Sequence, residues 1–363
     1  MKYFYTLAFV VIGLCISAQE SDVILTNQAI NKHIEKHLKS TNTTFDWNQA
    51  NLDLFWSALV NGDSTVVIGY KSEATNFIES LRSFDNSKEE WRSAKNAIVG
   101  KIKAFNEAKY GNDFPSHYFD IIYDNTYLPN ILIKVFDKSL LQELRLMSEI
   151  RYLEVANFEF NPAAEKSNLG CSDYSQVLST ADYTAISPQS IQSWVHLEHQ
   201  VDAAWLKCNK GEGITVAVFD SGVSGTNPKF NSEFTEGEST GRTINKYGFY
   251  PPTAPDGWQD QCGHGTAMGG LIAAPRGYDD TPAGMAYKCD FISYRVTNDV
   301  VINASDEYIA LANAITDATN NTSAQIGSIS LGDVVNHGPV TTAIQIAHAN
   351  GMLIFAAAGT LTI

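Results

Sequence analysis

The stretch that decides the fold is GITVAVFD, residues 213–220, a continuous apolar run that ends in Asp220. Three similar runs follow it, namely CDFISYRV (289–296), IGSISL (326–331) and GMLIFAAA (351–358). Helical patterns lie between them, namely GTAMGGLIAA (265–274), SDEYIALANAITDAT (305–319) and PVTTAIQIAHAN (339–350). Buried strands that alternate with helices predict an α/β fold in which a parallel sheet carries helices on both faces.

The residues ahead of this pattern indicate a smaller α+β unit. Residues 22–165 contain β-like runs such as STVVIGY and RYLEV, and helical patterns such as EEWRSAKNAIVGKIKAFNEA. Asp137 stands where a helix cap is expected before an apolar helical face. Residues 166–197 are rich in Ser, Thr and Asp without sustained periodicity, so we expect a connector there. The parallel-sheet domain is then expected to span residues 198–363.

Composition and charge limit the classes of function that the chain can have. The chain has 363 residues, and its apolar fraction of 44% suits a globular protein with a real core. Its formal net charge of −15 disfavours nucleic acid as a partner, because phosphate binding needs basic patches.

Residues 1–18 are typical of a secretory signal peptide. Lys2 supplies the charged start, Leu7–Ile16 forms a short apolar run, and a small-residue cleavage site ends at Ala18. The alternative is a membrane anchor, which needs about 20 apolar residues and so fits this run poorly. We therefore expect a protein that is secreted or at the cell surface after signal-peptide removal, without a membrane span.

Export changes the interpretation of the cysteines. After the signal segment the chain contains Cys171, Cys208, Cys262 and Cys289, and four cysteines allow three pairings. Four free thiols, or a metal site that uses Cys262 and His264, are the alternatives, although no C-x-x-C pair supports structural zinc. We expect Cys262 to be disulfide-bonded, with Cys289 as the favoured partner because both flank the segment around His264.

Two residues are candidates for chemistry. Asp220 follows an apolar strand, and active sites of parallel sheets form at the carboxyl ends of strands, although an aspartate there is also a common turn former or helix cap. His264 stands in DQCGHGTAMGG, residues 260–270, between Gly263 and Gly265. We expect these glycines to keep the surroundings of the imidazole open to a partner residue and a substrate.

Taken together, these segments carry a specific resemblance. VAVFDSGVSGTNP, CGHGTAMGGLIAAP, PAGMAY, ISLG and GMLIFAAAG follow one another in the order of the motifs of subtilisin-like serine proteases, the subtilases. The resemblance covers roughly residues 198–360. It implies a subtilisin-like domain in which His264 is the general base and Asp220 fixes and stabilises its imidazole. It also implies that Ser330, Leu331 and Gly332 form a substrate-binding strand for a peptide or protein substrate.

The third catalytic residue of the family is a serine in a G-T-S-M-A-type motif, and the 363 residues contain no such motif. We therefore interpret the chain as an amino-terminal fragment of an exported serine endopeptidase precursor, and expect the chain by itself to be inactive. The alternative is a non-catalytic, protease-like domain that binds peptides without cutting them.

Two further departures concern the oxyanion and calcium. Subtilases usually carry an asparagine that binds the oxyanion after AAG, and here Thr360 follows Gly359. Thr360 is therefore the oxyanion candidate. Calcium is the only cofactor that the resemblance suggests, but Lys229 stands where many members have a calcium-binding acid, so the usual site is not expected to be intact.

The first region is similar, more loosely, to the inhibitory propeptide of the family. YDNTYLPNILIKVFDKSLLQELRLMSEIRYLEV carries the strand-helix-strand order of such a propeptide. We expect a segment from about residue 50 to residue 160 to fold separately and to pack against the protease-like domain as the propeptide of that domain. Processing is expected in the connector, between about Phe160 and Leu197.

Overall fold

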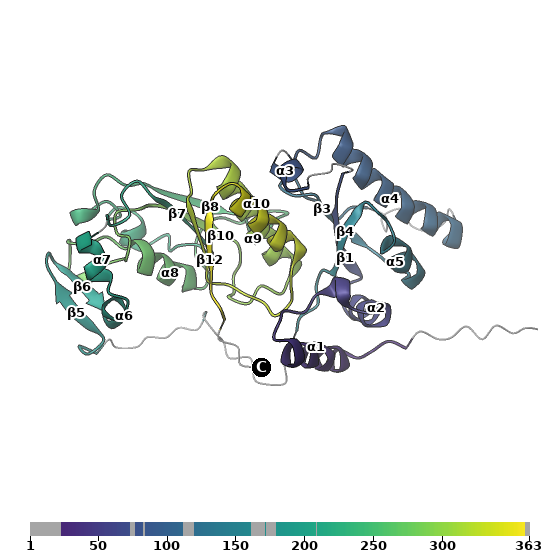
Figure 1. Cartoon of the computed structure of the whole chain (residues 1–363), viewed down its shortest axis with the longest axis horizontal. Coiled ribbons are helices and arrows are strands. Elements are labelled where there is room, and N and C mark those ends of the chain that lie inside the picture. The colour runs from purple at the N-terminus through teal and green to yellow at the C-terminus, as the bar shows by residue number, and fades with distance from the viewer. Residues whose placement is uncertain are drawn as a thin grey trace, which may run out of the picture.

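A computed structural model describes residues 23–72, 77–82, 84–111, 120–160, 171, 179–207 and 209–359. Within these ranges the chain forms an amino-terminal and a carboxyl-terminal region, each built on its own sheet (Figure 1). The predicted signal peptide lies outside the described residues. No helix in the described part of the chain is both long and apolar enough to cross a bilayer.

The amino-terminal region is an antiparallel sheet with strand order β2-β3-β1-β4, packed with helices. Its strands are β1 (Thr65–Tyr70), β2 (Tyr123–Asp124), β3 (Asn130–Lys134) and β4 (Ile150–Val155). Its helices are α1 (Asn27–Thr41), α2 (Leu52–Asn61), α3 (Phe77–Arg82), α4 (Glu89–Tyr110) and α5 (Lys138–Leu144), with a 3-10 turn at Trp47–Gln49. This agrees with the α+β pattern of the sequence.

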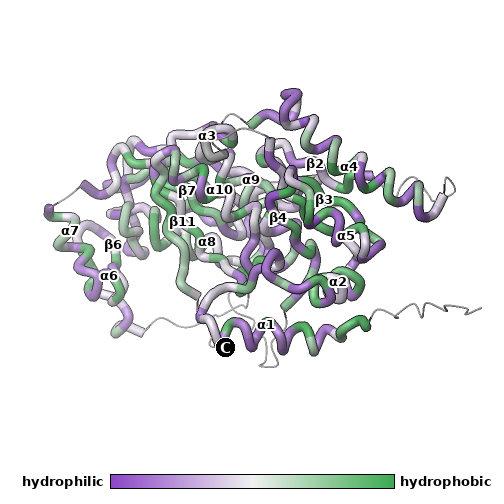
Figure 2. The backbone as a smooth tube through the Cα atoms, turned by 45° about the vertical axis from the view of Figure 1, so that its right-hand side comes forward, coloured by the Kyte–Doolittle hydropathy of each residue, from purple (hydrophilic) through white to green (hydrophobic). Residues whose placement is uncertain are grey.

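Local chemistry explains where these elements begin. The predicted cap Asp137 accepts hydrogen bonds from the backbone N–H groups of Ser139 and Leu140 at the start of α5. All six residues of β1 are buried, and β1 is an inner strand that pairs with β3 on one side and β4 on the other. In Figure 2, α1 and α4 alternate between hydrophilic and hydrophobic stretches, whereas β3, β7 and β11 are largely hydrophobic.

The carboxyl-terminal region contains the predicted parallel sheet, which is confirmed. Its strand order is β12-β11-β7-β10-β8, and every neighbouring pair is parallel. The strands are β7 (Thr215–Asp220), β8 (Ile244–Gly248), β10 (Asp290–Arg295), β11 (Ile326–Ile329) and β12 (Leu353–Ala356). The main helices are α8 (His264–Ala273), α9 (Ser305–Asn321) and α10 (Gly338–Ala349), with 3-10 turns at Pro228–Phe230 and Gly237–Ser239.

The central strand β7 faces helices on both sides. Ala217 and Phe219 point into the cluster that contains α9 and α10, whereas Val216 and Val218 point into a second cluster that includes Ala273 of α8. This alternation follows the two-residue period of a strand. It leaves Asp220 at the carboxyl end of the sheet.

Part of the segment expected to be a connector, residues 166–197, is folded. A three-stranded sheet joins β5 (Tyr183–Ile186) and β6 (Ser190–Ser193) to β9 (Thr281–Pro282), and is followed by α6 (Trp194–Glu198) and α7 (Val201–Lys207). The strands are two to four residues long and half-exposed, so they carry too few apolar positions to produce a periodic signal. Residues 166–170 and 172–178 lie outside the described residues. The domain boundaries stay predictions.

The two regions share one hydrophobic core, which runs from the amino-terminal sheet through α9 and α10 to β7 (Figure 1). Polar contacts cross this junction. The Asn125 side-chain amide donates to Asn313 of α9 at 2.8 Å, and the Tyr308 hydroxyl donates to the Ala156 carbonyl at 3.2 Å. Phe45 also pairs with Val335 as an isolated parallel bridge. The amino-terminal region therefore covers the outer side of α9.

Candidate active site

The candidate site begins where β7 ends. Asp220 is the last residue of the strand and is 1% exposed. Its backbone carbonyl accepts a hydrogen bond from Val296 N–H, and its carboxylate accepts one from Ser221 N–H, both at 2.8 Å. The neighbouring strand and the turn that follows β7 thus fix the direction of the carboxylate.

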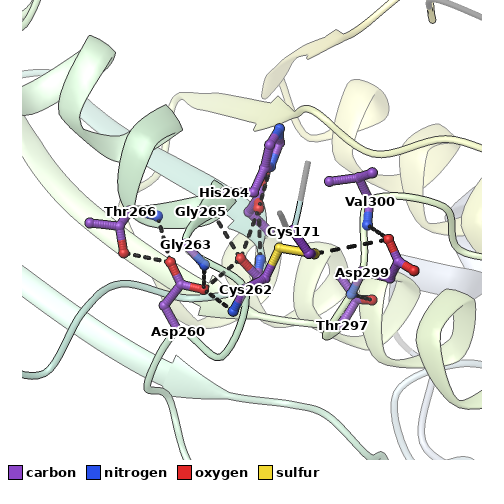
Figure 3. Close-up of polar contacts among 12 residues, drawn as sticks. Cys171, Asp260, Cys262, Gly263, His264, Gly265, Thr266, Thr297, Asp299 and Val300 are labelled. Atoms are coloured by element: carbon purple, nitrogen blue, oxygen red, sulfur yellow. Dashed lines mark hydrogen bonds and ion pairs between the residues drawn. A yellow bond between two sulfur atoms is a disulfide. The ribbon is translucent and has the colours of Figure 1, made fainter. Parts of the chain in front are cut away.

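His264 is the first residue of α8, and its ring meets this carboxylate. Nδ1 lies 2.9 Å from Asp220 Oδ1 and 3.1 Å from Oδ2, so an Nδ1–H donates to the carboxylate (Figure 3). The side chain of His264 is 18% exposed. With Nδ1 engaged, Nε2 is the ring nitrogen that can exchange a proton with another group.

The environment changes the basicity of this imidazole. The hydrogen bond to Asp220 raises the pKa of His264 above its ordinary value of 6.5, partial burial opposes this, and the charges of Asp220 and Asp260 add to the increase. A neutral His264 near neutral pH is therefore a stronger base than a free histidine.

The two glycines beside His264 have different structural roles. Gly263 has φ of +94° as the residue before α8, a conformation that side chains rarely adopt. A Cβ on Gly265 would stand 2.2 Å from the Gly222 carbonyl oxygen, so the helix start packs directly on the backbone after Asp220. Gly265 thus allows the helix to approach the strand end, whereas Gly263 has open space beside it and allows the positive φ of the turn before α8.

Sequence reasoning missed Asp260, which lies beside the pair. Its carboxylate accepts hydrogen bonds from the backbone N–H groups of Cys262, Gly263 and Thr266 and from the hydroxyl groups of Thr266 and Ser221 (Figure 3). Its position four residues before His264, directly ahead of a helix start, is the signal that could have identified it as a capping residue.

The predicted disulfide between Cys262 and Cys289 is wrong. Cys262 is bonded to Cys171, with 4.7 Å between the Cα atoms, in the range that disulfides require (Figure 3). Cys289 is a free, fully buried thiol just before β10, and burial raises its pKa to about 11. It packs inside the core on the α8 side of the sheet, whereas Cys262 lies in the loop ahead of α8. Cys208 lies outside the described residues.

The predicted substrate-binding strand, Ser330 to Gly332, follows β11 directly. Ser330 is half-buried, Leu331 is buried, and Gly332 is exposed. The Gly332 N–H donates to the Val300 carbonyl at 3.2 Å, and its carbonyl accepts from Ile302 N–H at 3.1 Å. Both backbone groups of Gly332 are thus engaged, so a peptide that pairs with this segment has to use its other groups or replace these bonds.

Two predicted positions remain, Thr360 and Lys229. Thr360, the oxyanion candidate, lies outside the described residues. The Lys229 ammonium forms ion pairs with Asp279 at 2.5 Å and Glu233 at 3.1 Å, so a protein cation neutralises these carboxylates. Among the described residues, no group of three or more His, Cys, Asp or Glu side chains could hold a metal ion.

The chain is similar to known proteins in sequence. Residues 211–361 match the Peptidase_S8 family model, described as the subtilase family. Thermitase from Thermoactinomyces vulgaris is 29% identical over 160 residues, which cover 44% of this chain and 52% of thermitase. Subtilisin from Bacillus sp. (strain TA39) is 26% identical over 180 residues, covering 49% of this chain and 41% of that protein. The chain thus spans about half the length, or less, of these relatives.

Solved structures also align with the chain. Fervidolysin from Fervidobacterium pennivorans, described as a keratinolytic enzyme related to subtilisin, gives a TM-score of 0.47 at 17% identity, covering 82% of this chain and 40% of that one. The epidermin leader peptide processing serine protease of Staphylococcus aureus gives a TM-score of 0.45 at 16% identity, covering 81% of this chain and 60% of that one.

The central position of Asp220 in a parallel sheet, with His264 opening the following helix, defines a subtilisin-like α/β domain. Residues 211–361 match the family model of the subtilases, which agrees with the resemblance drawn from the motifs.

Proposed function

We propose that this chain supplies the aspartate and histidine of a subtilase-type serine endopeptidase that hydrolyses peptide bonds. The observation that carries the proposal is the hydrogen bond between His264 Nδ1 and the buried carboxylate of Asp220 at the carboxyl end of β7. In the proposed reaction, His264 Nε2 takes the proton of a serine hydroxyl as that oxygen attacks the peptide carbonyl, and then gives it to the leaving amine. Asp220 holds the imidazole and stabilises its protonated form.

The proposal includes a nucleophilic serine that the 363 residues do not supply in the motif of the family. The active enzyme is therefore the product of the complete reading frame, and the 363-residue chain alone is expected to have no triad activity. If the complete reading frame also lacks such a motif, the alternative of a non-catalytic, peptide-binding domain is favoured.

The raised pKa of His264 sets the expected pH dependence. A general base must be neutral, so activity is expected to fall as the pH falls through the pKa of His264, which lies above 6.5. The midpoint of the acidic limb of kcat/KM in the free enzyme is therefore expected above pH 6.5.

The test is hydrolysis of casein and of fluorogenic peptides by the product of the complete reading frame. His264→Ala and Asp220→Asn are each expected to reduce kcat by about 10⁴-fold or more. His199→Ala, which removes an exposed histidine away from the pair, serves as the matched control and is expected to keep full activity. Undiminished hydrolysis by the Asp220 or His264 variant would exclude the proposed mechanism.

We further propose that the amino-terminal region is the propeptide of this enzyme and that the protein is exported. The support is the shared core and the hydrogen bonds between this region and α9 and α10. Sequencing the amino terminus of the active form tests both points. An active form that still carries residues 50–160 would contradict the propeptide, and one that retains residues 1–18 would contradict export through a cleaved signal.

A further inference from the structure

Asp260 has more hydrogen bonds than a helix cap requires. Its Oδ1 accepts from Ser221 Oγ at 2.8 Å, Cys262 N–H at 2.9 Å and Gly263 N–H at 2.7 Å. Its Oδ2 accepts from the Thr266 N–H at 2.9 Å and the Thr266 hydroxyl at 2.5 Å. Both oxygens are thus filled by donors from the segment that carries His264 and from the turn after Asp220.

Some of the hydrogen bonds to Asp260 take the place of the side-chain cap that α8 lacks. Gly263 is the residue before α8 and has no side chain that could accept from the first N–H groups of the helix. Asp260 takes this role from outside the helix, because it accepts from Thr266 N–H in the first turn. The carboxylate therefore fixes the direction of the helix start on which His264 stands.

The contact with Ser221 connects Asp260 to the other half of the pair. Ser221 follows Asp220 and is fully buried. Its hydroxyl has two acceptors within reach, Asp260 Oδ1 at 2.8 Å and Asp220 Oδ1 at 3.3 Å, and the shorter contact is the one to Asp260. The hydroxyl oxygen accepts from Gly265 N–H at 2.9 Å. The hydroxyl thereby joins the residue after Asp220 to the residue after His264, and Asp260 sets its orientation.

The charge of Asp260 acts on the imidazole as well. Burial opposes ionisation of Asp260, but the hydrogen bonds from Thr266, Gly263 and Cys262 outweigh it and hold its pKa below the ordinary value. Asp260 is therefore a carboxylate at neutral pH, and its charge adds to that of Asp220 in raising the pKa of His264.

We infer that Asp260 is a positioning residue for the Asp220–His264 pair, which it holds in register through Ser221 and the first turn of α8. It touches neither the imidazole nor a reacting atom, and acts through the groups it binds. The inference rests on the proposed function, because the relative position of Asp220 and His264 affects hydrolysis only if these two residues are catalytic. Figure 3 shows how its bonds fan out toward Cys262, Gly263 and Thr266.

The test is an NMR titration of the full 363-residue chain with isotope-labelled histidine. Asp260→Asn is expected to lower the pKa of His264 and to make its Nδ1 proton exchange with water about tenfold faster, because a charged hydrogen-bond network is lost. Asp279→Asn is the matched control. It removes a carboxylate that also accepts a threonine hydroxyl, from Thr281, but that lies in another loop, and it is expected to leave both readouts unchanged.

A second pair of variants separates geometry from charge. Both variants keep the charge of Asp260. Ser221→Ala removes the hydroxyl that links Asp260 to the turn after Asp220, and Thr266→Val removes one of its bonds to the start of α8, the one from the Thr266 hydroxyl. Both are expected to speed exchange of the Nδ1 proton, with a smaller change in the pKa of His264 than Asp260→Asn gives. These two variants also carry the test if Asp260→Asn does not fold.

The results distinguish this inference from the proposed function. A His264 that titrates and exchanges as in the wild type in Asp260→Asn, while the melting temperature falls, would show that Asp260 is only a helix cap and would overturn the inference. Unchanged exchange in both Ser221→Ala and Thr266→Val would overturn it as well. Full hydrolysis by the Asp220→Asn enzyme would instead overturn the proposed function and leave the NMR result standing.

Discussion

Glu154 lies in β4 at the junction of the two regions and predicts a pH-dependent stability. Its side chain is buried, one carboxylate oxygen accepts from Gly338 N–H at 2.5 Å at the start of α10, and the other has no hydrogen-bond partner. Burial raises the pKa of Glu154 from its ordinary 4.5 to about 7. The charge of Asp46 adds to this increase, whereas the charges of His337 and Arg151 and the hydrogen bond from Gly338 oppose it.

The sign and size of the effect follow from linkage. Glu154 binds its proton more tightly in the folded chain than in the unfolded one. Its contribution to stability is therefore complete below about pH 4.5 and is lost as the pH rises through about 7. At about 1.4 kcal/mol per pKa unit, the difference corresponds to about 3 kcal/mol of unfolding free energy.

Glu154→Gln removes this titration and keeps an oxygen that can accept from Gly338. Its buried amide hydrogens bring a cost of about 1–3 kcal/mol that does not depend on pH. The wild type is therefore expected to lose about 3 kcal/mol relative to the variant between about pH 4 and pH 8. The assay is urea unfolding followed by tryptophan fluorescence across this range, with Glu198→Gln, at an exposed glutamate, as the control that should parallel the wild type. Parallel curves for the wild type and Glu154→Gln would refute the reasoning, because Glu154 would then titrate alike in both states.

Three other perturbations have expected outcomes. Gly265→Ala places a Cβ 2.2 Å from the Gly222 carbonyl oxygen and should lower the unfolding free energy by about 3 kcal/mol, whereas Gly270→Ala, with no atom within 4 Å, should be neutral or stabilising by up to about 1 kcal/mol. Equal thermal shifts for the two variants would show that the close approach does not matter. Asp137→Ala removes the cap of α5 and the hydrogen bonds from Lys109 and Tyr110, and should cost about 2 kcal/mol in chemical unfolding. A change within experimental error would contradict the capping role. Cys289 should resist alkylation in the native chain at pH 8 and react only after unfolding, since it is buried with a pKa of about 11, and rapid native labelling detected by mass spectrometry would count against this.

The sequence was sufficient for elements with a strong period. The apolar run before Asp220 and the helical pattern at 305–319 predicted β7 and α9, because buried strands and long helices carry many apolar positions. β8 was missed, since INKYG is an edge strand with one large apolar residue at its start and alternating exposure. β5 and β6 were missed for the same reason, as short strands at a half-exposed edge contain little hydrophobic signal.

The site divides in a similar way. Asp220 and His264 stand in motifs whose order along the chain predicts their proximity, and the structure brings them together. Asp260 and the Cys171–Cys262 bond depend instead on contacts between distant segments. Spacing along the chain gave no basis for choosing Cys171, which is 91 residues from Cys262 and lies in a segment whose sequence has no sustained periodicity. Cys289, in contrast, opens the apolar run CDFISYRV, so its neighbours in sequence already indicated a place in the buried sheet.

The disulfide between Cys171 and Cys262 divides the connector into two parts, in which a cut has different covalent consequences. A peptide bond cut between residues 160 and 171 leaves no covalent bond between the amino-terminal region and the rest of the chain, so only the shared core and its hydrogen bonds hold the two together. A cut anywhere from residue 171 to residue 262 falls inside the covalent ring that the disulfide closes, and the two pieces remain a single molecule. Such a nicked chain migrates as one species without reductant and as two species with it. Cleavage on the carboxyl side of Cys171 thus leaves a covalent link that cleavage on the amino side does not, and a reducing agent removes that difference.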